Sequence, residues 1–131
     1  MYLGIDLGEK TTGLAISEGQ LAGPFKTITH KNTLEAAAKI IQIVNQEKVD
    51  KVVIGFVEGK IKSLFLNFAR QLKELNPNIV IIMQDETLTS LQARQLQIKL
   101  SVPKNKRKEK EHEVAAAIIL QSYLDTLGLS S

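Results

Sequence analysis

The chain has 131 residues and a net charge of +3, and its 44% hydrophobic and 24% charged residues are the balance of an ordinary globular protein. This length favours one domain over residues 1–131, and the composition excludes disorder across the whole chain. Because cysteine is absent, disulfides and thiolate metal sites are excluded. No apolar run approaches the ~18 residues that span a bilayer, and the N-terminus lacks a signal peptide pattern, so we expect a cytoplasmic protein without a membrane partner.

The first thirty residues predict three short strands that form an antiparallel meander. Turn signals at Gly19 and Gly23-Pro24 separate apolar runs over Tyr2–Leu7, Gly13–Ser17 and Phe25–Thr29. A helix capped by Asn32 or Thr33 follows, with apolar residues at helical spacing up to about residue 50.

The rest of the chain alternates strands with helices. The predicted elements are strands over Lys51–Gly55 and Ile79–Met83, helices over Ile61–Leu75, about 87–100 and Glu111–Leu127, and a basic loop over Ser101–Lys110. Five consecutive apolar residues in Ile79–Met83 indicate a central strand that is covered on both faces. Together the elements predict an α/β fold, in which a mixed five-stranded sheet of order 3-2-1-4-5 has helices on both faces.

Asp6 is a candidate site residue because it lies inside the first apolar run. A carboxylate in a central strand is costly to desolvate unless it is paired or bound to a metal. Strand alternation places Tyr2, Gly4 and Asp6 on one face and the leucine and isoleucine side chains on the other. Either Asp6 caps the turn before Gly8, or it ligates a metal at the end of the strand.

Two further groups of polar residues can converge on Asp6. Asp85 and Glu86 follow the last strand, where an α/β sheet opens to its ligand cleft, although two acids also suit a helix start. Glu109, His112 and Glu113 share a face if the last helix begins by Lys108, although they also suit a solvated acidic turn. Carboxylates that gather from three places can hold Mg²⁺ or Mn²⁺ and activate water against a phosphodiester.

A run of cations precedes the last helix and provides a candidate surface for nucleic acid. The run comprises Lys104, Lys106, Arg107, Lys108 and Lys110. Such a run is either a solvated loop or a binding site for phosphate.

The combined motifs resemble the YqgF family, also called RuvX, of Holliday junction resolvases and pre-16S rRNA nucleases. The resemblance rests on the segments Gly4-Ile-Asp-Leu-Gly-Glu-Lys10, Gly13-Leu-Ala-Ile-Ser17, Val53-Ile-Gly55, Asp85-Glu-Thr-Leu-Thr-Ser90 and Val114-Ala-Ala-Ala-Ile-Ile-Leu120. It runs from end to end of the chain and implies a ribonuclease H-like fold. It also implies a metal-dependent endonuclease that processes the 5′ end of pre-16S rRNA, resolves four-way DNA junctions, or both, as a monomer or homodimer.

Carried over by position, the resemblance makes Asp6 and Glu86 the first two catalytic acids and Asp85 an acidic neighbour. Lys10 matches a basic residue that could face phosphate. The third family acid aligns with His112, and the motif arginine aligns with Thr87. Imidazole weakens a magnesium site and favours softer metals, while Glu113 or Glu109 could replace the missing charge.

Two other functions are compatible with these residues. The substitutions at His112 and Thr87 leave open a nucleic-acid-binding module of the same fold with weakened catalysis. The segment from Gly4 to Gly13 also resembles the first phosphate loop of actin-like ATPases, but a second such loop and a second domain are missing from the sequence.

Overall fold

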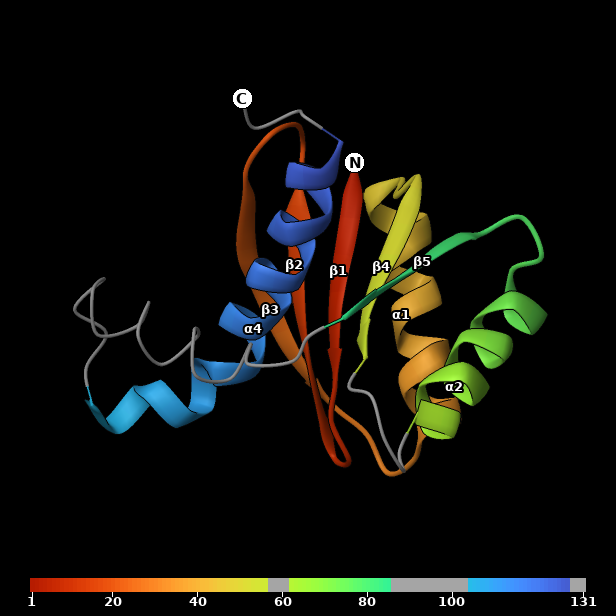
Figure 1. The fold of residues 1–131 in the computed structure, drawn as a ribbon. Helices are drawn as coiled ribbons and strands as arrows, with labels where there is room; N and C mark the ends of the chain where they lie inside the picture. Colours follow the sequence, from red (N-terminus) through yellow and green to blue (C-terminus); the bar gives the residue numbers. More distant parts are fainter. Residues whose placement is uncertain (57–61, 86–103, 128–131) are drawn as a thin grey trace.

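A five-stranded mixed sheet forms the centre of the fold in the computed structural model, which describes residues 1–56, 62–85 and 104–127 (Figure 1). The elements in chain order are β1 (Tyr2–Leu7), β2 (Thr11–Ser17), β3 (Ala22–Thr29), α1 (Thr33–Glu47), β4 (Lys51–Phe56), α2 (Lys62–Leu75), β5 (Val80–Asp85) and α4 (Lys104–Thr126). The helix predicted over residues 87–100 lies outside the described residues.

The strand order is β3-β2-β1-β4-β5, which confirms the predicted topology. The three N-terminal strands pair in an antiparallel manner, whereas β1 pairs with β4 and β4 with β5 in parallel. β1 is therefore the middle strand, and its carboxyl end lies beside the carboxyl end of β4. This is the edge at which parallel sheets bind their ligands.

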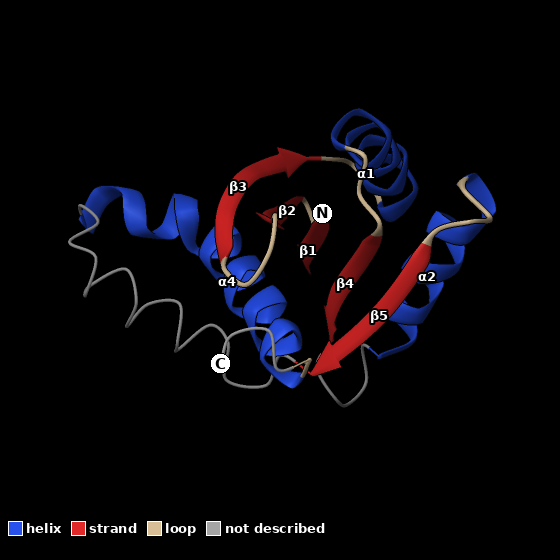
Figure 2. Ribbon diagram, turned by 90° about the horizontal axis from the view of Figure 1, so that it is seen from above, coloured by secondary structure: helices blue, strands red, loops and turns tan. Residues whose placement is uncertain are grey.

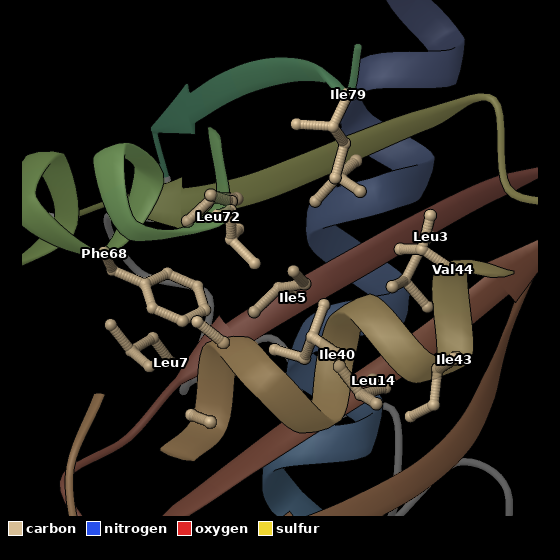
Figure 3. Packing of buried hydrophobic residues seen from close by; sticks show 14 of the residues in the cluster. Leu3, Ile5, Leu7, Leu14, Ile40, Ile43, Val44, Phe68, Leu72 and Ile79 are labelled. Atoms are coloured by element: carbon tan, nitrogen blue, oxygen red, sulfur yellow. The ribbon is translucent and has the colours of Figure 1, made fainter. Parts of the chain in front are cut away.

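Helices cover both faces of the sheet: α1 and α2 lie on one side and α4 on the other (Figure 2). Asn32 caps α1, because its side-chain oxygen accepts a hydrogen bond from the Glu35 backbone N–H at 2.8 Å. Leu3, Ile5 and Leu7 of β1 face α1 and α2 in the larger core (Figure 3). Tyr2 faces the smaller core under α4, as strand alternation predicts.

The backbone of α4 lies directly on the sheet because two strand positions carry no side chain. A Cβ atom at Gly13 would be 2.0 Å from the carbonyl oxygen of His112. One at Gly4 would be 2.7 Å from the carbonyl oxygen of Ala116, one turn further along the helix. The two glycines thus fix both the height and the register of α4 above β1 and β2.

Two expectations from the sequence were wrong. The run Ile79–Met83 is not covered on both faces by the described part of the chain: β5 lies at the edge of the sheet, as the predicted strand order requires, Val80 is exposed, and Ile81 to Met83 are only partly buried. An unbroken apolar run shows that both faces need cover, but it does not give the position of a strand in the sheet.

The segment from Lys104 to Lys110 is helical, whereas the sequence predicted a loop. Lysine and arginine are good helix formers, and proline is favoured just before or at the first helical position. The charge of this run therefore does not oppose a helix. Its backbone forms the first turns of α4, which extend away from the sheet (Figure 1).

We expect Gly13→Ala to destabilise the fold by about 1–3 kcal/mol or more, because the new methyl group meets backbone atoms that cannot rotate away. Urea denaturation of the purified protein measures this change. Gly23→Ala is the matched control, because a Cβ atom at this position would meet nothing within 4 Å among the described residues. Equal stability of the two variants would contradict the proposed role of Gly13.

Candidate functional site

A direct contact joins the middle strand to the last helix. The Nδ1 atom of His112 lies 2.7 Å from Oδ2 of Asp6. The Asp6 side chain is 13% exposed and that of His112 is 39% exposed, so the pair lies at the rim of the fold and solvent reaches it. Two residues that are 106 positions apart in the chain therefore form one polar site.

The local structure explains why these side chains meet. Asp6 occupies the carboxyl end of β1 and pairs in register with Gly13 of β2. The backbone of His112 rests on Gly13, so its ring lies over the neighbouring strand, where Asp6 points. Gly8 borders the imidazole as well, since a Cβ atom there would be 3.4 Å from Cε1 of His112.

The contact assigns a proton to one imidazole nitrogen. An ionised carboxylate only accepts hydrogen bonds, so Nδ1 of His112 donates to Asp6. This hydrogen bond raises the pKa of His112 above its ordinary value, although partial burial opposes the shift. In the neutral ring, Nε2 keeps its lone pair, and a carboxylate on the other nitrogen is the usual orientation of a metal-binding histidine.

The other predicted acids do not join this pair among the described residues. Asp85 is exposed at the end of β5, and Glu113 points toward β3, where its Oε2 accepts a hydrogen bond from Thr27 Oγ1 at 2.9 Å. In residues 1–56, 62–85 and 104–127, no three histidine or acidic side chains lie close enough to hold a metal ion together. Glu86 and the side chain of Glu109 lie outside the described part.

The predicted cations lie on two elements. Lys10 is exposed in the turn between β1 and β2, and Lys110 is exposed on α4. Lys104, Lys106, Arg107 and Lys108 belong to the first turns of α4, and their side chains lie outside what the structure describes. Positive charge is therefore carried by the turn that follows Asp6 and by the helical turns that precede His112.

A buried histidine beneath the site was not predicted to have a role. Nε2 of His30 lies 2.7 Å from Thr12 Oγ1, which also accepts a weak hydrogen bond from the Gly8 N–H at 3.4 Å. The backbone N–H of His30 donates to the Lys10 carbonyl at 2.9 Å. His30 thus holds the turn that follows Asp6, and burial lowers its pKa. No local pattern could reveal this role, because Thr12 and His30 are 18 positions apart.

A groove of about 730 Å³ opens beside His112, between α4 and the outer strands. One wall is the stretch from Lys110 to Glu113. The other wall consists of side chains from β2 and β3: Thr11, Phe25, Lys26, Thr27 and Thr29. The sequence did not indicate this groove, because its walls come from opposite ends of the chain.

Comparison with known proteins matches residues 1–126 to the family model RuvX, described as Holliday junction resolvase. A protein of Caldanaerobacter subterraneus subsp. tengcongensis, named "Putative pre-16S rRNA nuclease", is 37% identical over 95% of each chain. A protein of Staphylococcus saprophyticus with the same name is 34% identical, again over 95% of each chain.

Two solved structures with a similar fold are complexes with Holliday junctions. The fowlpox virus resolvase bound to Holliday junction DNA aligns with a TM-score of 0.62 at 15% identity, covering 96% of this chain and 97% of that one. RuvC of T. thermophilus with a Holliday junction substrate aligns with a TM-score of 0.58 at 12% identity, covering 98% and 96%. The fold is therefore ribonuclease H-like. No helix in the described part of the chain is long and apolar enough to cross a membrane.

We expect the two histidines to titrate on opposite sides of 6.5. A raised folded-state pKa means that the Asp6–His112 contact stabilises the fold below pH 6.5 and loses this effect as the pH rises through the folded-state pKa. A lowered pKa means that His30 lowers stability as the pH falls through 6.5, because the unfolded chain then binds the proton more readily.

NMR titration of the two imidazole rings measures both pKa values. Asp6→Asn keeps a hydrogen-bond acceptor but removes the charge, so it should lower the pKa of His112 and leave that of His30 unchanged. If His112 in the wild-type protein titrated at or below 6.5, the contact with Asp6 would be refuted.

Proposed function

Since this chain belongs to the RuvX family of Holliday junction resolvases, we propose that it is a metal-dependent endonuclease for structured nucleic acid, with the 5′ end of precursor 16S rRNA as its main substrate. The chain is a nuclease, a hydrolase of phosphodiester bonds, by its family and its relatives. The rRNA substrate follows the name of the relatives, and resolution of four-way DNA junctions is the activity that the family name carries.

The observation that supports this function best is the contact between Asp6 and His112 at the carboxyl end of β1. A carboxylate at the end of a middle strand is costly to keep unless it serves a site. Here it orients an imidazole, and both side chains remain accessible to solvent. These observations support a site in which Asp6 supplies an oxygen ligand and His112 a nitrogen ligand beside a substrate phosphate.

The proposed catalytic residues are Asp6, Glu86 and His112. Asp6 offers a carboxylate oxygen and His112 an imidazole nitrogen; because Nδ1 faces Oδ2 in the structure, the two residues would bind one ion together only after this hydrogen bond opens. Glu86 follows β5 directly in the sequence and would approach from the side of β4. Lys10 and the cations of α4, from Lys104 to Lys110, bind the phosphates that flank the cleaved bond.

The ligand atoms fit a divalent cation that accepts both oxygen and nitrogen. When it is bound, such an ion places positive charge beside the phosphate and activates water for the attack. Enzymes of this family use divalent metal ions, and we propose Mg²⁺ or Mn²⁺ for this chain. The imidazole favours Mn²⁺ over Mg²⁺, because Mg²⁺ strongly prefers oxygen ligands.

A second candidate function is a nucleic-acid-binding module with weakened catalysis. The observation behind it is His112 itself, which stands where the family has an acid and brings no full negative charge to the site. In this case the chain binds its nucleic acid in a salt-dependent manner without turnover. Cleavage by the purified protein decides between the two functions.

For the organisation of the protein, we propose that residues 1–131 act as one domain in the cytoplasm, where rRNA is processed. A monomer suffices to cut a single RNA strand. Resolution of a junction needs two matched cuts and would require a homodimer.

We expect Asp6→Asn to lower the rate of cleavage by about 100-fold or more, because it removes a charged ligand whose contribution is several kcal/mol. The measurement is cleavage of a precursor rRNA fragment and of a four-way DNA junction in Mg²⁺ and Mn²⁺, with EDTA as the blank. Asp50→Asn is the control, since Asp50 lies at the opposite end of the sheet beside the N-terminal amine. Unchanged cleavage by Asp6→Asn would refute the proposed site.

We expect His112→Asp to shift the metal preference from Mn²⁺ toward Mg²⁺, because it replaces nitrogen by a charged oxygen. Thermal stabilisation by each ion, measured without substrate, reports the change in metal affinity directly. In the wild-type protein Mn²⁺ should raise Tm at a lower concentration than Mg²⁺, and the difference should shrink in the variant. A difference between the two ions that is the same in both proteins would show that His112 does not bind the metal.

A further inference from the structure

We propose that the groove between α4 and β3 binds the sugar–phosphate backbone of an RNA strand and distinguishes RNA from DNA through the 2′-hydroxyl groups. The inference rests on the proposed nuclease function and names the path of its substrate. The groove is about 730 Å³ in volume, enough for part of a strand but not for a duplex. It assigns a role to threonines of β2 and β3 that neither the family motifs nor the cation run involve.

The groove is continuous with the Asp6–His112 site. His112 lines the groove and also contacts Asp6. Asp6, Gly13 and Thr27 lie in register across β1, β2 and β3, so their side-chain positions share one face of the sheet. The backbone of α4 crosses Gly13, between Thr27 and Asp6, so an RNA strand in the groove reaches the site at His112, whose ring contacts Asp6.

The polar groups of the groove match the chemistry of a ribose backbone. Three threonines contribute hydroxyl groups, and Glu111 and Glu113 contribute carboxylates that only accept hydrogen bonds. A DNA backbone offers only acceptors, so it can form no hydrogen bond with the carboxylates in the wall. RNA adds one hydrogen-bond donor per nucleotide, the 2′-hydroxyl. The threonine and glutamate oxygens of the groove can accept a hydrogen bond from it.

Glu113 is held in place for such contacts. Its Oε2 accepts a hydrogen bond from Thr27 Oγ1 at 2.9 Å, which fixes the carboxylate against the β3 wall of the groove. A carboxylate has about four acceptor positions, so this bond leaves the others for the substrate. Thr11 and Thr29 are paired in register one step further along the strands and extend the row of hydroxyl groups.

Each wall of the groove also carries a cation. Lys26 is exposed on β3 and Lys110 is exposed on α4. Lys110 adds positive charge from α4, and Lys26, whose Nζ lies over the Phe25 ring on the edge strand β3, adds it from the other side. The hydroxyls and carboxylates of the groove meet the ribose. Cations beside hydroxyl and carboxylate groups suit a sugar–phosphate chain better than an isolated anion.

The first test is the effect of Thr29→Val and Thr11→Val on the preference for RNA over DNA. Fluorescence anisotropy measures Kd for a short labelled RNA strand and a DNA strand of the same sequence, with Ca²⁺ as the divalent ion and gels to verify intact strands. Each variant should weaken RNA binding by about three- to ten-fold, the effect of one hydrogen bond, and leave DNA binding unchanged. Equal affinity for both strands in the wild-type protein, or equal losses for both in the variants, would overturn the proposal.

Lys26→Gln provides a second, different signature. It should weaken RNA and DNA binding to the same extent and lower the slope of log Kd against log salt by about 0.7, the value for one phosphate contact on a single strand. Lys51→Gln is the matched control, because Lys51 begins β4 at the opposite end of the sheet, over the ring of Tyr2. If the Lys26 variant bound both nucleic acids as the Lys51 variant does, the RNA strand would not bind in this groove.

The binding test is independent of catalysis. If the wild-type protein bound RNA in the groove as described but cut no substrate, the RNA-binding role of the groove would be supported and the nuclease function would be refuted. If the protein cut rRNA but the threonine and lysine variants bound RNA and DNA like the wild-type protein, the RNA-binding role of the groove would be refuted and the nuclease function would be supported.

Discussion

The close approach of α4 to the sheet is the constraint on which the site depends. Gly13 admits the backbone of His112, and Gly4 admits that of Ala116, so the helix is seated at two points one turn apart. The first point sets the imidazole beside Asp6, and the second leads into the core formed by Ala116, Leu120 and Val53. Packing and chemistry therefore share one element: the same helix that completes the hydrophobic core carries the polar group of the site. The groove exists for the same reason, since α4 leaves the sheet just before this contact.

Most of the fold could be predicted from the sequence because its signals are local. Alternation in β1 separated Leu3, Ile5 and Leu7 from the face of Asp6, and the order of strands and helices led to the observed sheet. The two errors concern context. The apolar run of β5 shows how hydrophobic the strand is but not which neighbours it has, and the charges at Lys104–Lys110 hid a helix whose continuation into the core stabilises it. Propensity and charge are weak indicators where tertiary contacts decide.

The site could be predicted only in part. Asp6 stood out because a carboxylate in an apolar strand needs a partner, and His112 because it replaces an acid of the family motif. The roles of Glu113 and His30 could not be predicted, since both depend on which side chain from a distant segment lies opposite: Thr27 in one case and Thr12 in the other. Hydrogen bonds between distant segments produce no local pattern in the sequence from which they could be predicted. The same holds for the groove, whose walls belong to β2, β3 and α4.

The 106-residue separation of Asp6 and His112 has a consequence for synthesis of the protein. Translation produces the sheet and its first covering layer well before α4 emerges from the ribosome, because domains are made from the N-terminus onward. Until then, the carboxylate of β1 has no imidazole beside it and the groove has only one wall. A nascent or truncated chain therefore lacks both His112 and the α4 wall of the groove, the two parts that the proposed function assigns to this helix.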